Sequence, residues 1–337
     1  MKYTKLGKTG LEISRICFGT MSFGMPNEKR PWVLQDDDAR PLFRKALEAG
    51  INFIDTANTY ASGTSEELTG RMLKEMARRD EIVLASKVYN RMRPGPNGAG
   101  LGRKAIMSEI DNSLRRLGTD YLDLYQIHRW DYATPIEETL DALNDVVKAG
   151  KTRFIGASSM FAWQFAKALF TSDLNGWSRF VSMQSEVSLV AREEEHEMIG
   201  LCQDQGIALI PWSPLGAGKL TRPWAELTHR SRTDIFNKTM YDVKDGGAPE
   251  IVAAVASLAQ SRGVPMAQIA MAWLLHKDGI TSPIIGASKL EHVQDAVAAV
   301  DLRLSADEIA TLEAPYRPKG VPAYLHDNRP DRAPGTE

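Results

Sequence analysis

This sequence of 337 residues has few cysteines, little net charge and no long apolar run. Its two cysteines, Cys17 and Cys202, lie far apart, which gives neither a disulfide framework nor zinc-ligand spacing, so we expect two reduced core thiols. The 41 basic and 43 acidic residues leave a formal net charge of −2. This balance predicts no nucleic-acid partner and no anionic membrane partner, because both favour a basic surface.

The first residues lack the apolar stretch of a signal peptide. No run of about 18 apolar residues is long enough to cross a bilayer. We therefore expect a cytoplasmic protein. Hydrophobic residues make up 43% and charged residues 25% of the chain, which is typical of a soluble globular protein. We expect one domain spanning residues 1–337, since barrel domains often exceed 250 residues.

What the sequence does contain is a regular alternation of short apolar runs with longer amphipathic stretches. Strands are predicted at 16–19, 51–55, 82–87, 122–128, 152–157, 180–184, 207–212 and 282–286. Helices are predicted at 36–49, 65–76, 104–117, 136–149, 162–170, 193–205, 250–262, 266–276, 290–300 and 305–312. Strands that alternate with helices imply a parallel sheet. Eight such units favour an α/β fold closed into a (β/α)8 TIM barrel over an open doubly wound sheet.

Several segments outside this alternation also carry predictions. Residues 2–14 alternate apolar side chains around two glycines and predict a hairpin that plugs one end of the barrel. The long loops 90–103 and 214–249 follow strands, so they belong to the C-terminal face, where barrel enzymes do chemistry. Residues 317–337 predict a C-terminal loop. Ser65 is a predicted helix cap, and Ser305 with Glu308 has capping-box spacing.

Ionisable side chains stand at the ends of three successive predicted strands. Asp55 ends the second strand, Lys87 the third and His128 the fourth, and Tyr60 follows Asp55 by five residues. Neighbouring strands lie about 4.8 Å apart, so these side chains can converge. Each residue alone has an ordinary structural explanation, such as a turn former or a solvated strand end. Their shared placement predicts a common site.

The residue types suit the reduction of a carbonyl group. A carbonyl that accepts a hydride becomes an alkoxide and needs a proton, which Tyr60 can donate. An ammonium such as that of Lys87 lowers the pKa of a nearby phenol, and a carboxylate such as Asp55 keeps a buried lysine charged. A ring nitrogen of His128 can donate a hydrogen bond that orients the carbonyl. A rival interpretation makes Lys87 the nucleophile of a Schiff-base aldolase or lyase.

The same residues carry a resemblance to the aldo-keto reductase family, from about Tyr3 to about Tyr316. Residues 50–57 with Tyr60 resemble the family's aspartate and tyrosine stretch, residues 85–88 its lysine stretch, and residues 113–128 its histidine stretch. Residues 130–135 and 210–215 look closest to bacterial-type members with broad carbonyl substrates. The resemblance implies a catalytic tetrad of Asp55, Tyr60, Lys87 and His128 acting on a small-molecule carbonyl substrate.

The resemblance also implies NADPH as cofactor, bound across the barrel mouth without a Rossmann fold. Ser158, Ser159 and Gln184 would contact the carboxamide, although Ser159 replaces a common asparagine. Trp212 would stack on the nicotinamide, and Lys289 would meet the 2′-phosphate. Lys289 could also be no more than an exposed lysine at a helix start. The residues implied to line the pyrophosphate are Ser213, Leu215, Gly216, Gly218 and Lys219, and those implied to hold the adenosine end are Gly286, Ser288, Lys289 and His292. The full implied set is Gly19, Thr20, Met21, Ser158, Ser159, Gln184, Trp212, Ser213, Pro214, Leu215, Gly216, Gly218, Lys219, Gly286, Ser288, Lys289 and His292.

Candidate substrate-pocket residues are aromatic and favour flat or apolar carbonyls, although the same side chains could be packing. They are Phe23, Trp32, Tyr89 and Trp130. The acidic run 193–197 reads as a helix start rather than a metal site, so no metal is predicted. A second alternative function is a barrel that binds NADPH and senses redox state without catalysis. The sequence makes no prediction of oligomeric state.

Overall fold

The computed structural model describes residues 1–28, 30–226, 228–234 and 245–318. Part of the predicted loop 214–249 and most of the predicted C-terminal loop 317–337 lie outside these residues.

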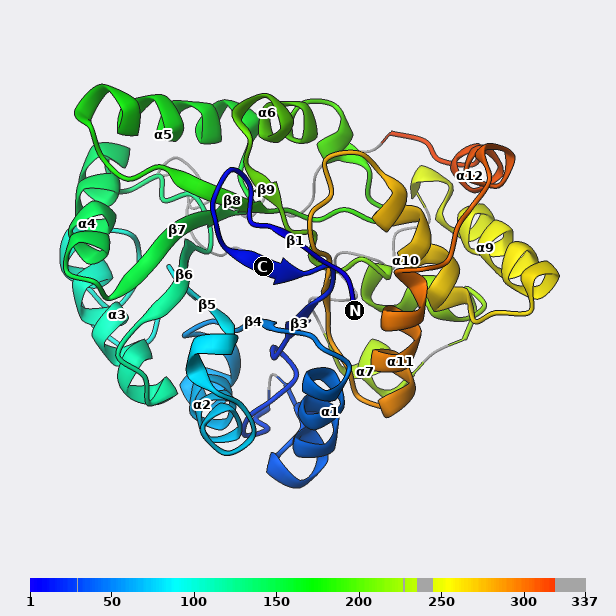
Figure 1. The fold of residues 1–337 in the computed structure, drawn as a ribbon, viewed down its shortest axis with the longest axis horizontal. Coiled ribbons are helices and arrows are strands. Elements are labelled where there is room, and N and C mark those ends of the chain that lie inside the picture. The colour runs from blue at the N-terminus through cyan, green and yellow to red at the C-terminus, as the bar shows by residue number, and fades with distance from the viewer. Residues whose placement is uncertain (29, 227, 235–244, 319–337) are drawn as a thin grey trace.

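Eight parallel strands form one curled sheet (Figure 1). They are β3 (Cys17–Gly19), β4 (Phe53–Asp55), β5 (Val83–Val88), β6 (Leu122–Ile127), β7 (Thr152–Ser158), β8 (Phe180–Gln184), β9 (Ala208–Leu209) and β10 (Ile284–Ile285). The sheet order is β10-β3-β4-β5-β6-β7-β8-β9. The edges are joined by a parallel bridge between Leu209 and Ile280 and by the Ile284 amide, which donates to the Pro211 carbonyl at 2.7 Å. This arrangement is consistent with the expected (β/α)8 barrel.

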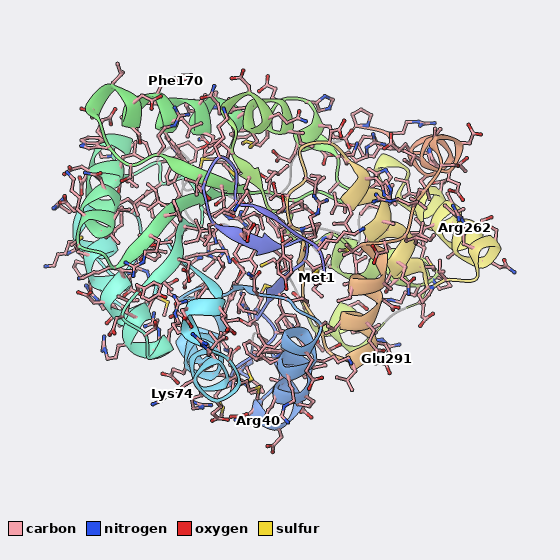
Figure 2. The ribbon with its side chains drawn as sticks, viewed as in Figure 1. Met1, Arg40, Lys74, Phe170, Arg262 and Glu291 are labelled. Atoms are coloured by element: carbon pink, nitrogen blue, oxygen red, sulfur yellow. The ribbon has the colours of Figure 1, made fainter. Side chains whose placement is uncertain are left out.

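Helices surround the strands in Figure 1. They are α1 (Asp36–Glu48), α2 (Thr64–Met76), α3 (Arg103–Leu117), α4 (Ile136–Lys148), α5 (Ala162–Asn175), α6 (Met198–Gln205), α7 (His229–Thr233), α9 (Ala248–Arg262), α10 (Met266–His276), α11 (Leu290–Ala299) and α12 (Ala306–Glu313). Charged side chains labelled in Figure 2, such as Arg40, Lys74 and Arg262, lie at the periphery. Helices such as α1 and α4 bury their apolar residues and carry charged ones outside. Helix α5 differs, because it also leaves Trp163, Phe170 and Leu174 exposed.

The predicted helix 193–205 is wrong as a continuous element. A single 3₁₀ turn, Glu193–Glu195, is separated from α6 by Glu197, whose φ of −141° breaks the helix. Tertiary contacts hold this turn, because Tyr316 donates to a Glu193 carboxylate oxygen at 2.7 Å and Lys277 Nζ lies 3.1 Å from a Glu195 carboxylate oxygen. These contacts override the local helical pattern.

The two predicted caps have opposite outcomes. Ser65 is not the cap of α2, because Gly63 occupies that position with a φ of 96°. The Ser65 hydroxyl is buried and donates instead to the Thr20 carbonyl at 2.7 Å. The capping box of α12 is confirmed, since Ser305 Oγ accepts from the Glu308 amide and the Glu308 carboxylate accepts from the Ser305 amide.

The N-terminal hairpin lies over one end of the strands. Strands β1 (Tyr3–Lys5) and β2 (Glu12–Ser14) pair antiparallel, and Figure 1 shows them across the middle of the ring. Leu6 and Ile13 are fully buried in one cluster with the first interior residues of three strands, Cys17, Phe53 and Val83. The position is consistent with the expected plug of one barrel end, here the end where the strands begin. The opposite end, where the strands finish, is thereby left for the long loops.

Candidate active site

Strand alternation decides which polar residues meet at the C-terminal end of the sheet. The interior cluster takes in Phe53 of β4, Val83 and Ala85 of β5, and Leu124 of β6. Successive side chains of a strand point to opposite faces, so Asp55, Lys87 and Gln126 continue the same inward positions. His128 comes two residues after Gln126, just beyond β6. Lys87 and Gln126 are register partners on neighbouring strands.

Lys87 is the centre of the site. Its side chain is fully buried, and its Nζ donates to Asp55 Oδ2, to the Thr56 carbonyl at 2.9 Å and to the Tyr60 hydroxyl at 3.2 Å. Burial acts to lower the pKa of Lys87, but the Asp55 carboxylate and Tyr60 outweigh it and raise that pKa above its ordinary value. Lys87 is therefore an ammonium held between a carboxylate and a phenol.

The second oxygen of Asp55 is held by two amides. Asp55 Oδ1 accepts from Gln126 Nε2 at 3.1 Å and from Gln184 Nε2 at 3.0 Å. Gly156 makes room for this network, because a Cβ there would lie 2.3 Å from Ser182 Oγ and 3.2 Å from Gln126 Cγ. With both oxygens engaged, the carboxylate is fixed in orientation and Lys87 with it.

Tyr60 is positioned by a tight turn after β4. It opens the 3₁₀ segment Tyr60–Gly63, in which Ala61 and Ser62 adopt positive φ values of 46° and 56°. Left-handed backbone costs roughly 1 kcal/mol or more for a non-glycine residue. The turn holds the Tyr60 side chain nearly buried, with its hydroxyl at Lys87 and its ring edge-on to His128 at a centroid separation of 5.8 Å.

His128 faces Tyr60 as a neutral imidazole. Protein atoms surround most of the ring although part of its surface stays accessible, and this burial, with Lys87, Arg129 and Arg30, lowers the pKa of His128 well below its ordinary value. The Asn90 amide nitrogen lies 3.3 Å from His128 Nδ1. An amide NH₂ is a donor, so Nδ1 accepts and Nε2 carries the proton. The ring can therefore donate one hydrogen bond at neutral pH.

Three of the predicted cofactor residues, Ser158, Ser159 and Gln184, are linked to one another and to the tetrad. Ser158 Oγ donates to the Gln184 carbonyl at 2.9 Å, and Ser159 Oγ accepts from Trp212 Nε1 at 3.1 Å. Ser159 has a positive φ of 52°. The amide of Gln184 is already engaged by Asp55, so the residue joins the predicted carboxamide site to the predicted proton-transfer site.

The predicted pyrophosphate residues form a compact turn after β9. The 3₁₀ segment Gly216–Thr221 contains left-handed residues, among them Gly216 at a φ of 53° and Gly218 at 91°. Ser213 is left-handed, Pro214 is buried and Leu215 is partly exposed. Lys219 is almost fully buried, with its Nζ 4.7 Å from the Trp224 ring centroid.

The predicted adenosine residues lie at the start of α11, where the chain is accessible. Gly286, Ser288, Lys289 and His292 are all exposed, and the Ser288 amide donates to His292 Nδ1 at 3.3 Å. Although His292 is exposed, the protein atoms around its ring partly desolvate it and lower its pKa, and the charges of Lys289 and Arg222 lower it further. Arg222 therefore belongs to this basic group, and sequence reasoning missed it because it stands in a different loop.

The remaining predicted cofactor residues lie at the end of β3, where Gly19 is its last residue and Thr20 and Met21 follow. A Cβ on Gly19 would lie 2.6 Å from Ile284 Cγ2, so glycine is needed for close strand packing. Thr20 is fully buried and its hydroxyl is 3.2 Å from Ser65 Oγ. Met21 is partly exposed.

The predicted substrate residues divide into two groups. Phe23 is fully buried and packs on Phe18 with ring centroids 5.7 Å apart, so a substrate would have no contact with it in this arrangement. Trp32, Tyr89 and Trp130 are partly exposed. Tyr89 and Trp130 also pack on the core, so the packing interpretation stays open for them.

Sequence reasoning missed several residues that the fold brings to this region. Trp163 on α5 is 59% exposed, and its ring centroid lies 6.1 Å from that of Trp130. Asn90 reaches His128, and Arg30 lies over the Tyr60 ring. Gln126, which donates to Asp55, was also missed as a site residue. It had a local signal in the sequence, since it is a polar residue at an inward strand position two residues before His128.

The described residues contain no helix long and apolar enough to span a membrane. They likewise contain no group of three or more His, Cys, Asp or Glu side chains arranged to hold a metal ion.

The chain is similar over most of its length to known proteins. The profile described as the aldo/keto reductase family matches residues 15–317. Versiconal hemiacetal acetate reductase from Aspergillus parasiticus is 41% identical over 341 residues, covering 95% of this chain and 98% of that protein. A Schizosaccharomyces pombe protein provisionally named an aryl-alcohol dehydrogenase is also 41% identical over 341 residues, covering 94% of this chain and 96% of its own. An aldo-keto reductase from Fusarium vanettenii is 39% identical over 346 residues, covering 96% of this chain and 93% of that protein. These three are fungal, and the resemblance to bacterial-type members stays a prediction.

Proposed function

Because this chain belongs to the aldo/keto reductase family, we propose that it reduces aldehydes or ketones to alcohols with NADPH, using Asp55, Tyr60, Lys87 and His128. The observation that carries the proposal is the position of Lys87 Nζ, between the Asp55 carboxylate and the Tyr60 hydroxyl 3.2 Å away. Bound NADPH would supply the hydride.

The chain's own residues account for the proton. Tyr60 donates its phenolic proton to the oxygen of the reduced carbonyl, and the Lys87 ammonium stabilises the phenolate that remains. Asp55 keeps Lys87 charged. His128, neutral and protonated on Nε2, donates a hydrogen bond that orients the carbonyl oxygen beside Tyr60. Such positioned acid catalysis typically contributes about 10²- to 10⁴-fold in rate.

The residues present fit a nicotinamide cofactor. Trp212 offers a partly exposed aromatic ring whose indole nitrogen is already bonded to Ser159. Glycines with left-handed backbone allow close approach of a phosphate. The cations Lys289 and Arg222, which both act on His292, suit the additional phosphate of NADPH.

The decisive experiment is a carbonyl panel followed by the loss of NADPH absorbance, spanning aromatic aldehydes, α-dicarbonyls, pyridoxal and sugar aldehydes. The relative named for aryl-alcohol dehydrogenation makes aromatic aldehydes the first class to test. Carbonyl-dependent oxidation of NADPH is the expected result. NADPH binding without turnover of any carbonyl would favour a redox-sensing role instead.

The Schiff-base alternative is separable on the same preparation. A nucleophilic amine must be neutral, whereas Lys87 is fully buried, paired with Asp55 and raised in pKa. We therefore expect borohydride, with carbonyl substrate and no cofactor, to leave Lys87 unmodified in mass spectrometry. Covalent trapping on Lys87 would support an aldolase and contradict the reductase.

Cofactor choice is tested at Lys289. We expect Lys289→Ala to raise the Kd for NADPH by about tenfold, the low end for a charged hydrogen bond, and to change the Kd for NADH far less. Fluorescence titration measures both. An equal change for the two cofactors would remove Lys289 from the 2′-phosphate.

A further inference from the structure

Arg30 is a cation beside the proposed proton donor with no role yet assigned. It lies in the loop between β3 and α1, where its backbone amide donates to the Asn27 carbonyl at 3.0 Å and to Asn27 Oδ1 at 2.9 Å. The same loop is tied together by the Leu34 amide, which donates to the Ser22 carbonyl at 2.7 Å. The backbone that carries Arg30 is thus well anchored.

The Arg30 guanidinium faces the reacting side chains. Its Cζ lies 6.0 Å from the Tyr60 ring centroid. Its Nη1 is buried and donates to no atom among the described residues, and Arg30 makes no ion pair with any of them. Arg30 as a whole is partly exposed, but a charged donor atom that is buried without an acceptor is costly. Its presence next to a proposed active site indicates a ligand group that would accept from it.

The surrounding charges leave this side of the site positive. Arg30, Arg129 and Lys87 all act on His128 as positive charges. Lys87 is neutralised by Asp55. Asp131, the next carboxylate along the chain from His128, is occupied elsewhere, since its Oδ2 accepts from the Leu101 amide and from Thr134.

We infer that this site takes carbonyl substrates bearing an anionic oxygen group, carboxylate or phosphate, and that Arg30 binds that group while Tyr60 and His128 hold the carbonyl. The inference rests on the proposed function and narrows its substrate class. A guanidinium matches either anion with two parallel hydrogen bonds. Together with the partly exposed Trp130, it favours an aromatic aldehyde with an acidic substituent over a purely apolar one.

The test compares kcat/KM for 4-carboxybenzaldehyde, its neutral methyl ester and 4-formylphenyl phosphate. We expect the wild type to prefer an anionic aldehyde over the ester, and the better anion identifies carboxylate or phosphate. In Arg30→Gln the anion-to-ester ratio should fall by about tenfold or more, the usual effect of losing a charged hydrogen bond. In Arg30→Lys the anion-to-ester ratio should fall less, because lysine keeps the positive charge but cannot make two parallel hydrogen bonds to the anion.

Arg44→Gln is the matched control, because Arg44 is exposed on α1 and its loss changes the net charge equally. Its anion-to-ester ratio should equal that of the wild type. An unchanged ratio in Arg30→Gln would overturn the inference. A uniform fall for charged and neutral aldehydes would also overturn it, since Arg30 would then act only by packing on Tyr60.

Failure of the proposed function would look different, because no carbonyl would then be reduced. The anion site is still tested by calorimetric titration of 4-(hydroxymethyl)benzoate. Binding that Arg30→Gln weakens about tenfold supports the site, and equal binding to both proteins refutes it.

Discussion

Lys87 shows how a single residue can combine stability with reactivity. A fully buried ammonium costs several kcal/mol unless it is paired, and Asp55 with the Thr56 carbonyl supplies the pairing. The same contacts direct its remaining hydrogen bond toward Tyr60. The charged state of Lys87 is thus maintained by its neighbours, against the effect of burial.

Removing the phenolic oxygen tests the assigned proton donor. We expect Tyr60→Phe to lower kcat for carbonyl reduction by about 10²- to 10⁴-fold, because no other hydroxyl contacts Lys87 among the described residues. NADPH binding, measured by fluorescence titration, should persist. Turnover like that of the wild type would refute the assignment.

His128 predicts a pH dependence of stability. Its pKa in the folded protein lies well below the unfolded value of about 6.5, so below that pH the unfolded chain binds a proton that the folded protein does not. The free energy of unfolding should therefore fall with decreasing pH, by up to about 1.4 kcal/mol per unit for this one group.

Urea unfolding of the wild type and His128→Gln between about pH 7.5 and pH 5.5 measures this dependence, since the variant lacks the titrating ring. The stability difference between them should shift in favour of the variant as the pH falls. His196→Gln, at an exposed position, controls for the loss of one histidine. A difference that does not change with pH would contradict the lowered pKa.

Among the elements, the helices differ in how closely they approach their neighbours. In α2, a Cβ on Gly70 would lie 2.2 Å from the Leu117 carbonyl oxygen at the end of α3. In α6, a Cβ on Gly200 would meet nothing within 4 Å. The glycine of α2 is therefore a packing requirement, whereas that of α6 carries only an entropic cost.

The two glycines form a matched pair of substitutions. Gly70→Ala should lower the free energy of unfolding by about 1–3 kcal/mol through overpacking. Gly200→Ala should raise it by about 0.4–1 kcal/mol, because alanine restricts the unfolded chain. Urea unfolding measures both, and equal effects of the same sign would contradict the close contact between α2 and α3.

At the scale of the whole molecule, the two ends of the sheet carry different kinds of residues. The hairpin covers the N-terminal end through Leu6 and Ile13, while the ionisable residues gather at the other end. The hairpin and the proposed active site thus lie at opposite ends of the strands. That residues 1–337 form one domain stays a prediction from the sequence.

The hairpin contact predicts a large cost for a small change. Leu6→Ala should lower the free energy of unfolding by about 2–5 kcal/mol, the usual effect of emptying a fully buried leucine site. Leu11→Ala, in the same hairpin but only partly buried, should cost clearly less. Equal costs in urea unfolding would mean that Leu6 does not seal the strand ends.

Local patterns predicted most elements and part of the site. The period of apolar residues placed the eight strands in order, and the ionisable residues at strand ends predicted the convergence of Asp55, Lys87 and His128. The pattern was wrong at 193–205, where partners distant in the chain, such as Tyr316, break the helix. The predicted helix cap at Ser65 was also wrong, because its hydroxyl donates to the Thr20 carbonyl.

The sequence by itself determined the parallel alternating fold and the residue types of the candidate site, because strand periodicity and side-chain chemistry are local properties. Only the tertiary structure decided that Gln126 and Gln184 share an Asp55 oxygen, that Asn90 meets His128, and that Arg30 lies over Tyr60. These contacts join segments separated by tens of residues. Their geometry depends on strand register and loop packing, which local periodicity does not encode.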